Sequence, residues 1–564
     1  MTALFGLGRK VEKRRMKGVA MVCVWALAFP AGIPAAQHNA SAAAAMALPQ
    51  QAAKTTTKQC EVNSSLTGPL IKARKLYRTG KFDEAIAAYK DILPNGGQDA
   101  AAAYAGLARI YLEQNKVDDA YSAANQAMEL TPGRAPAIVA LGEVYYRQGK
   151  FADAEMAFVK PIQNCDLDAR AFWGLYRVHA ASRNMKHAKM DIDQAFKLDP
   201  NDPDIQRAYF GTLTIDERIQ SLKKDLAQAG DEATKADTQK ELDALEERKA
   251  SPKNACRLAT PVKSTEAPLE RLFESGQRIS GFGLSMKING VPARLQLDTG
   301  AGGILINQNL ASKAGVKSMF EVSVKGIGDQ EEKKGKGFVG HADKIQIGAL
   351  EFDDCLVEVQ NQRTVAGVDG LIGANVFRNY LVDIYMEQTK LRLSELPRLP
   401  DEAEAQTSLD SESSAEGRWH DRYIAPEMKD YTQIFQVGHA LLIPTSVNST
   451  PSRLFMIDTG STDNELSLSA AKAVTHVDLT QHYVVTGVTG KVNKIYAADN
   501  ATLQFANIRQ EGQGLLAIDM NGMSESFGTE ISGLLGMQVL YLLRIKIDYR
   551  DGLVDFKPSA QYIK

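Results

Sequence analysis

The chain has 564 residues, of which 44% are apolar and 24% are charged. This usage is ordinary for globular proteins and excludes a chain that is disordered or fibrous throughout. The 66 Lys and Arg residues nearly balance the 68 Asp and Glu residues, for a net charge of −2, so we expect no nucleic-acid partner. At roughly 100–200 residues per domain, this length predicts three or four domains.

The N-terminus predicts an exported protein. Six Lys and Arg residues between positions 9 and 17 precede an apolar run from Gly18 to Phe29, and small residues follow from Ala31 to Ala36. This order is that of a secretory signal peptide, so we expect residues 1–36 to be a signal peptide and the protein to be periplasmic or secreted. An uncleaved anchor is the alternative, although a membrane-spanning helix needs about 20 apolar residues. We expect no other membrane segment.

Four cysteines follow the signal segment, namely Cys60, Cys165, Cys256 and Cys355. None of them has the Cys-x-x-Cys spacing of a zinc site, so we expect no metal. An oxidising compartment permits disulfides, but four cysteines allow three connectivities and the sequence does not select one. Structural thiols or a single bridge both fit.

A repeat begins after residues 37–66, whose Ala, Gln and Thr content predicts a flexible linker. Short turns recur at offsets of 34 or 35 residues, and a small residue five or six places further on recurs with them: Ala85, Ala120, Ala154 and Ala188. Such a period is typical of a solenoid of helical hairpins. We therefore expect an α-solenoid of four repeats over residues 67–213, followed by capping and connecting helices over residues 214–262.

The second of these repeats resembles the tetratricopeptide repeat. The resemblance rests on its pattern of aromatic, small and proline residues: Tyr104, Leu107, Ala108, Tyr111, Ala120, Ala124, Ala127 and Pro132. It implies that the solenoid binds a protein partner, and a mere spacer is the alternative.

Beyond the helices the pattern changes to short β-branched runs separated by glycines. Such runs are typical of all-β domains, and we expect two of them, at residues 263–400 and 419–564. The acidic, Ser-rich residues 401–418 between them predict a linker. Both regions contain an apolar strand followed by Asp-Thr-Gly, with Asp298 and Asp458 lying 160 residues apart. Each motif is followed by Gly-Leu, an apolar residue and Gly, so we interpret the two regions as a duplication.

Both β regions resemble lobes of the retropepsin-like and pepsin-type aspartic proteases, over about residues 265–396 and 420–558. The resemblance implies a bilobal unit with a pseudo-two-fold axis, in which Asp298 and Asp458 form the catalytic pair. It further implies that Thr299 and Thr459 make hydrogen bonds between the lobes, that Gly300 and Gly460 permit a tight loop, and that the hydroxyl of Ser461 bonds to Asp458. Ala301 at the matching place cannot do this for Asp298.

Two adjacent carboxyl groups suit peptide hydrolysis for a physical reason. Two carboxylates about 3 Å apart cannot both ionise, so they share one proton. The ionised member activates a water while the protonated member donates to the peptide carbonyl. We therefore expect an exported aspartic endopeptidase that acts on protein or peptide substrates without a cofactor. The sequence does not say which aspartate is the base.

Such an enzyme also needs flaps that cover the substrate. Gly-rich segments stand at matching places in the two regions, around Gly326 and Gly328 in the first and around Gly487 and Gly490 in the second. We expect a monomer whose lobes pair within one chain. Pairing of each lobe with its copy in a homodimer is one alternative, and a non-catalytic exported scaffold that binds peptides through degenerate lobes is the other.

Overall fold

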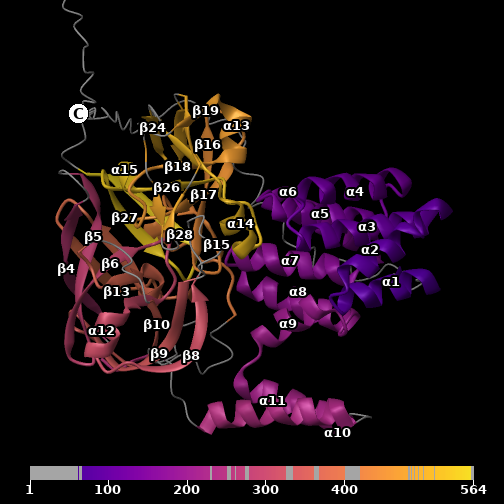
Figure 1. Ribbon diagram of the computed structural model, residues 1–564, viewed down its shortest axis with the longest axis horizontal. Helices are drawn as coiled ribbons and strands as arrows, with labels where there is room; N and C mark the ends of the chain where they lie inside the picture. Colours follow the sequence, from indigo (N-terminus) through magenta and orange to yellow (C-terminus); the bar gives the residue numbers. More distant parts are fainter. Residues whose placement is uncertain are drawn as a thin grey trace, which may run out of the picture.

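The computed structural model shows a helical unit followed by a β-rich region made of two units (Figure 1). It describes residues 61–62, 67–228, 232–250, 256–260, 262–273, 278–324, 335–360, 367–400, 419–480, 483, 485–487, 490–492, 494–499, 501–512 and 515–559. The expected signal peptide at 1–36 and the expected linker at 401–418 lie outside these residues. We call residues 67–250 the helical unit, 256–400 the first β unit and 419–559 the second β unit.

The helical unit contains four antiparallel hairpins in the region where the repeat predicts them. Their helices are α1 (Gly68–Arg78), α2 (Phe82–Lys90), α3 (Gly97–Glu113), α4 (Val117–Leu130), α5 (Ala135–Arg147), α6 (Phe151–Gln163), α7 (Ala169–Ala181) and α8 (Met185–Leu198), with a 3-10 turn η1 (Leu93–Asn95) after α2. Small residues permit the close packing: a Cβ on Gly142 or Gly174 would lie within 2.7 Å of the Phe158 ring. The four recurring alanines are all fully buried.

Three further helices follow, α9 (Pro203–Thr212), α10 (Ile215–Gln228) and α11 (Glu232–Ala250). Helices α10 and α11 pack on each other through four buried residues, Ile219, Leu222, Leu242 and Leu245. The prediction of helix over residues 214–262 is wrong at its C-terminal end, where Arg257–Leu258 form strand β3 and pair with a strand of the first β unit. Among the described residues, no helix has the length and apolar character needed to cross a membrane.

The first β unit is a twisted sheet closed by long antiparallel pairs. Its elements are β4 (Ser264–Phe273), β5 (Ile279–Ile288), β6 (Val291–Asp298), β7 (Ile304–Asn307), α12 (Gln308–Lys313), β8 (Lys317–Val324), β9 (Gly335–Ile347), β10 (Leu350–Gln360), β11 (Gly370–Gly373), η3 (Ala374–Phe377), β12 (Tyr380–Tyr385) and β13 (Lys390–Glu395). Strand β6 lies between β5 and β11, and β11 runs parallel to it.

The second β unit repeats much of this order. Its elements are η5 (Pro426–Met428), β14 (Thr432–Gln433), β15 (Phe435–Val437), β16 (Ala440–Val447), β17 (Arg453–Ile457), β18 (Glu465–Ser467), α13 (Leu468–Val474), β19 (Val477–Thr480), β20 (Thr486–Gly487), β21 (Gly490–Lys491), β22 (Ile495–Ala498), β23 (Ala501–Phe505), β24 (Ile508–Gly512), β25 (Leu516–Ile518), α14 (Asn521–Phe527), β26 (Gly533–Leu535), α15 (Met537–Leu540), β27 (Leu543–Asp548) and β28 (Leu553–Pro558). Strand β17 runs parallel to β26, as β6 does to β11. Asn307 and Ser467, 160 positions apart, each cap the helix that follows.

The two β units are joined through a shared sheet. Strand β12 of the first unit pairs antiparallel with β27 of the second, and Val382 lies opposite Ile547. One apolar core runs through both units. The carboxylate of Asp383 on β12 forms an ion pair with Arg544 on β27. The relative position of the two units is therefore fixed by backbone hydrogen bonds as well as by packing.

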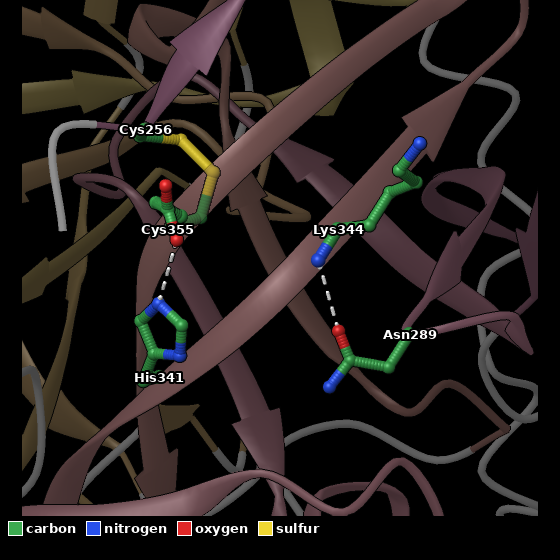
Figure 2. The surroundings of a disulfide bond; sticks show 6 residues. Cys256, Asn289, His341, Lys344 and Cys355 are labelled. Carbon is green, nitrogen blue, oxygen red and sulfur yellow. Dashed lines mark hydrogen bonds and ion pairs between the residues drawn. A yellow bond between two sulfur atoms is a disulfide. The ribbon is translucent and has the colours of Figure 1, made fainter. Parts of the chain in front are cut away.

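A disulfide links the start of the first β unit to its sheet. Cys256 is bonded to the fully buried Cys355 of β10, 99 residues further on (Figure 2). Close by, the imidazole of His341 lies 3.3 Å from the carboxylate of Asp354, and the side-chain carbonyl of Asn289 accepts from the backbone N–H of Lys344. Cys165 is also disulfide-bonded. The structure thus selects a bridge among connectivities that the sequence left open.

Candidate active site

Each Asp-Thr-Gly motif stands at the end of a strand. A second strand, which contains glycine, pairs with that strand and supports the motif from the side. Gly373 at the end of β11 pairs with Asp298, and Leu535 of β26 pairs with Ile457, the residue before Asp458. The braces need glycine because a Cβ on Gly373 would lie 2.4 Å from the carbonyl oxygen of Ala301. At Gly536, directly after β26, a Cβ would lie 2.0 Å from the carbonyl oxygen of Asp463.

The structure brings the carboxyl groups of Asp298 and Asp458 together within one chain. They lie within hydrogen-bonding distance of each other, and the two residues are only 8% and 7% exposed. The motif glycines lie against the opposite carboxyl group. A Cβ on Gly300 would be 2.7 Å from Cγ of Asp458, and one on Gly460 would be 2.4 Å from Cγ of Asp298. Any side chain at these two positions would push the carboxyl groups apart.

The two threonines tie the motifs to each other. The Thr299 hydroxyl donates to the carbonyl oxygen of Ile457 at 2.7 Å, and the Thr459 hydroxyl donates to that of Leu297 at 3.0 Å. Each hydroxyl oxygen also accepts from the backbone N–H of the other threonine, at 3.0 Å in both cases. Both residues are buried. These contacts between the units are of the kind that the resemblance implies for Thr299 and Thr459.

Backbone N–H groups hold the carboxyl groups in place. Gly300 donates to Oδ1 of Asp298 at 2.8 Å, and Gly460 donates to Oδ1 of Asp458 at 2.9 Å. Ser461 donates to the same Asp458 oxygen through its backbone N–H, at 3.1 Å. Its hydroxyl donates instead to the carbonyl oxygen of Asp463. The expectation of a hydroxyl contact from Ser461 to Asp458 is therefore wrong, because the following loop takes that hydroxyl.

Burial is the main electrostatic influence on the pair. It raises the pKa of Asp298 well above the ordinary range, and the negative charge of Asp458 raises it further. Burial also raises the pKa of Asp458, while hydrogen bonds from Asp298 and from the backbone oppose that rise. Two such groups titrate as a pair, so one shared proton is the favoured state over a range of pH. A pair in this state offers one acid and one base side by side.

Comparisons with known proteins agree with part of this geometry. Residues 284–379 match the family model described as "gag-polyprotein putative aspartyl protease". This chain contains an aspartyl protease-like domain. The matched segment includes Asp298 and the bracing strand β11, and no curated protein matches the chain.

The solved structures that match the chain include two tetratricopeptide repeat proteins. The TPR protein TTC0263 of Thermus thermophilus is 21% identical over 32% of this chain and 97% of its own, with a TM-score of 0.26. A tetratricopeptide repeat protein of Parabacteroides merdae is 16% identical over 32% of this chain and 72% of its own, with a TM-score of 0.23.

Of the four glycines predicted to lie in flaps, only two are among the residues that the structure describes. Gly326 and Gly328 lie outside the described residues, between β8 and β9, which pair antiparallel with Val324 opposite Gly335. In the second β unit, Gly487 pairs with Gly490 across the short strands β20 and β21.

Three residues near the pair carry roles that the sequence analysis does not predict. Glu465, Gln296 and His439 all approach the motifs, the last two from the opposite β unit. Only Gln296 carries a signal in the sequence, since it is a polar residue between two leucines, Leu295 and Leu297, just before the motif. The other two show no pattern that singles them out.

A cavity of about 850 Å³ lies away from the aspartates. It is lined by residues of the first β unit, and the charged ones include Glu270, Arg294 and Asp369. Asp369 directly precedes β11, whereas Asp298 pairs with the other end of that strand. The cavity therefore belongs to a different part of the unit. Across the described ranges, no group of three His, Cys, Asp or Glu residues is arranged to hold a metal ion.

Proposed function

We propose that this protein is an aspartic endopeptidase whose catalytic pair is Asp298 and Asp458. The observation that carries the proposal is the contact between two buried carboxyl groups, one from each β unit, which their threonines tie together. The match of residues 284–379 to an aspartyl protease model supports it for the first unit. For the second unit, the support is its own Asp-Thr-Gly motif and a parallel strand that pairs beside that motif, as in the first unit.

The chemistry follows from the shared proton. The ionised carboxylate takes a proton from a water molecule, and the protonated carboxyl donates its proton to the oxygen of the peptide carbonyl. The water oxygen bonds to the carbonyl carbon and gives a tetrahedral intermediate. Its breakdown transfers a proton to the departing amine and restores the pair. No covalent link to the enzyme and no cofactor is needed.

The wider setting is part of the same proposal. We propose an exported protein with a signal peptide at residues 1–36, and the disulfides support an oxidising compartment. The segments with Gly326 and Gly328 and with Gly487 and Gly490 would serve as flaps. The helical unit would recruit a protein partner or substrate, and the enzyme would act as a monomer, because both carboxyl groups come from one chain.

The test replaces each aspartate singly. Asp298→Asn and Asp458→Asn should each abolish cleavage of fluorescein-labelled casein, since one carboxyl group cannot be acid and base at once. Asp430→Asn, at an exposed position of the second β unit, is the matched control and should keep full activity. Circular dichroism checks that all three variants fold.

Retained proteolysis in either single variant would contradict the shared pair. A wild-type protein that cleaves no casein and does not bind a statine-type transition-state mimic would instead be a scaffold that uses its β units to bind peptides. Light scattering of the intact protein distinguishes a monomer from a dimer of paired units.

A further inference from the structure

The backbone next to each aspartate receives a hydrogen bond from the opposite β unit. Nε2 of Gln296, in the first unit, donates to the carbonyl oxygen of Gly460 at 3.4 Å. In the second unit, the imidazole of His439 hydrogen-bonds to the backbone of Gly300. This bond favours the protonated ring, so the ring is the donor and the Gly300 carbonyl the acceptor. The two glycines occupy equivalent places in their motifs, whereas Gln296 lies on β6 and His439 lies in the turn between β15 and β16.

His439 is held tightly on the first motif. A Cβ on Gly302 would lie 2.8 Å from Nδ1 of His439, so the ring rests on the backbone of that loop. Burial lowers the pKa of His439, so near neutral pH the ring is uncharged and has a single N–H to donate. On another side the ring of Phe527 packs edge-on against it, with 5.1 Å between the ring centres. The orientation of that N–H is therefore set by packing.

The helical unit in turn fixes the segment that carries Phe527. Helix α14 ends at Phe527, and Gly528 turns the chain with a φ of 68°. The hydroxyl of Thr529 then donates to the carbonyl oxygen of Tyr146 at 2.9 Å. The backbone N–H of Glu530 donates to the carbonyl oxygen of Arg147, also at 2.9 Å. Both acceptors lie at the end of α5, which Figure 1 shows near α14.

We propose that His439 is a positioning residue that holds the loop of Asp298, and that the docked helical unit keeps His439 in place through Phe527. This proposal rests on the proposed function, since its role is to orient a catalytic carboxyl group. It makes the helical unit part of the active-site support in addition to any recruiting role. Misplacing a reacting group by about 1 Å can cost on the order of 100-fold in rate, so a lost support should be measurable.

The first experiment compares two replacements of His439. His439→Leu fills the space but removes the N–H, whereas His439→Gln restores a neutral donor like that of Gln296. With casein as substrate, His439→Leu should lower kcat roughly 10- to 100-fold while KM changes little, because the loop orients the reaction and not the bound peptide. His439→Gln should recover most of the loss. A purely structural role would not separate these two variants.

A second measurement does not depend on activity. Hydrogen–deuterium exchange of the peptide that spans residues 297–303 should become faster in His439→Leu and stay near the wild-type rate in His439→Gln. Phe527→Ala should speed the same exchange, while Ser526→Ala, at an exposed position of the same helix, should not.

Each outcome decides a separate question. If the wild-type protein cleaves no casein, the proposed function fails, and the exchange data still test the support of the loop. If His439→Leu leaves both kcat and exchange unchanged, or if His439→Gln fails to restore them, the positioning role of His439 is wrong. If His439→Leu does not fold, the His439→Gln and Phe527→Ala variants decide. Unchanged exchange in Phe527→Ala would remove the helical unit from the proposal.

Discussion

A third carboxyl group is buried near the aspartate pair. Glu465 on β18 is only 4% exposed, and burial raises its pKa from 4.5 to about 8, with smaller contributions from the charges of Asp463 and Asp458. A raised pKa means that the folded protein prefers the protonated form. The neutral carboxyl group therefore stabilises the fold, and its ionisation destabilises it.

This pKa gives the stability a defined pH dependence. The contribution of Glu465 is fully present below pH 4.5 and is lost as the pH rises toward 8. Glu465→Gln stays neutral, so the variant should gain up to a few kcal/mol of unfolding free energy over wild type as the pH rises through that window. Urea unfolding at several pH values measures the difference. Glu427→Gln, at an exposed position, is the control and should show no such trend.

An equal stability of Glu465→Gln and wild type across the whole window would contradict the burial of an ionisable carboxyl group at this position. A difference that is largest at low pH would contradict the direction of the pKa shift.

At the level of single residues, the sequence predicts the site residues that belong to a short local motif. An apolar strand that ends in Asp-Thr-Gly, together with a distant Gly-containing partner strand, is enough to single out Asp298 and Asp458. The contact of Gln296 with Gly460 joins residues 164 positions apart. Such a contact depends on the relative placement of the two β units, which no periodic pattern in the sequence predicts.

Among the elements, helix α7 carries an unusual buried cation. Arg170 has only 4% of its side chain exposed and forms ion pairs with Glu143 of α5 at 3.1 Å and with Asp202, before α9, at 2.9 Å. A third pair joins it to Asp204 at 2.8 Å. The network ties the third and fourth hairpins to the helix that follows them. The repeat period predicts the hairpins, but this polar network has no counterpart in the pattern of small residues.

Removing the cation should be costly. Arg170→Met leaves the buried carboxylate of Asp202 without its ion-pair partner and leaves Glu143 with Arg109 alone. Breaking a buried pair in this way costs about 3–5 kcal/mol. Chemical denaturation of the full chain, followed by circular dichroism of the helical signal, measures the loss. Arg207→Met is the matched control, because Arg207 is 79% exposed in its pair with Asp204 and such pairs contribute only about 0–1 kcal/mol.

A loss for Arg170→Met no greater than that for Arg207→Met would show that the buried network adds little to the stability of the helical unit.

At the scale of the whole molecule, the helical unit and the second β unit share one apolar cluster. Phe151 of α6 is 3% exposed, stacks on Tyr146 at 4.8 Å and meets Phe435 of β15 edge-on at 4.9 Å between ring centres. Further along, Arg183 donates to the backbone carbonyl of Arg550 at 3.0 Å. In the sequence, the repeat period predicts the helical unit, and the short β-branched runs predict the β units. The sequence does not predict that the units dock, because the apolar residues of the interface cannot be told apart from the residues that form the core of each unit.

A double-mutant cycle tests whether this docking persists in solution. Phe151→Ala and Phe435→Ala remove the two rings singly and together, and aromatic pairs in contact typically couple by about 0.5–1.5 kcal/mol. We expect a coupling energy in that range from urea unfolding of the full chain. Phe196 of α8 is the control, because its ring stacks on Tyr209 of α9 at 3.9 Å between ring centres. The double-mutant cycle of Phe196 with Phe435 should be additive. Additivity in both cycles would show that the contact between Phe151 and Phe435 does not persist in solution, and would contradict the docking of the helical unit through this apolar cluster.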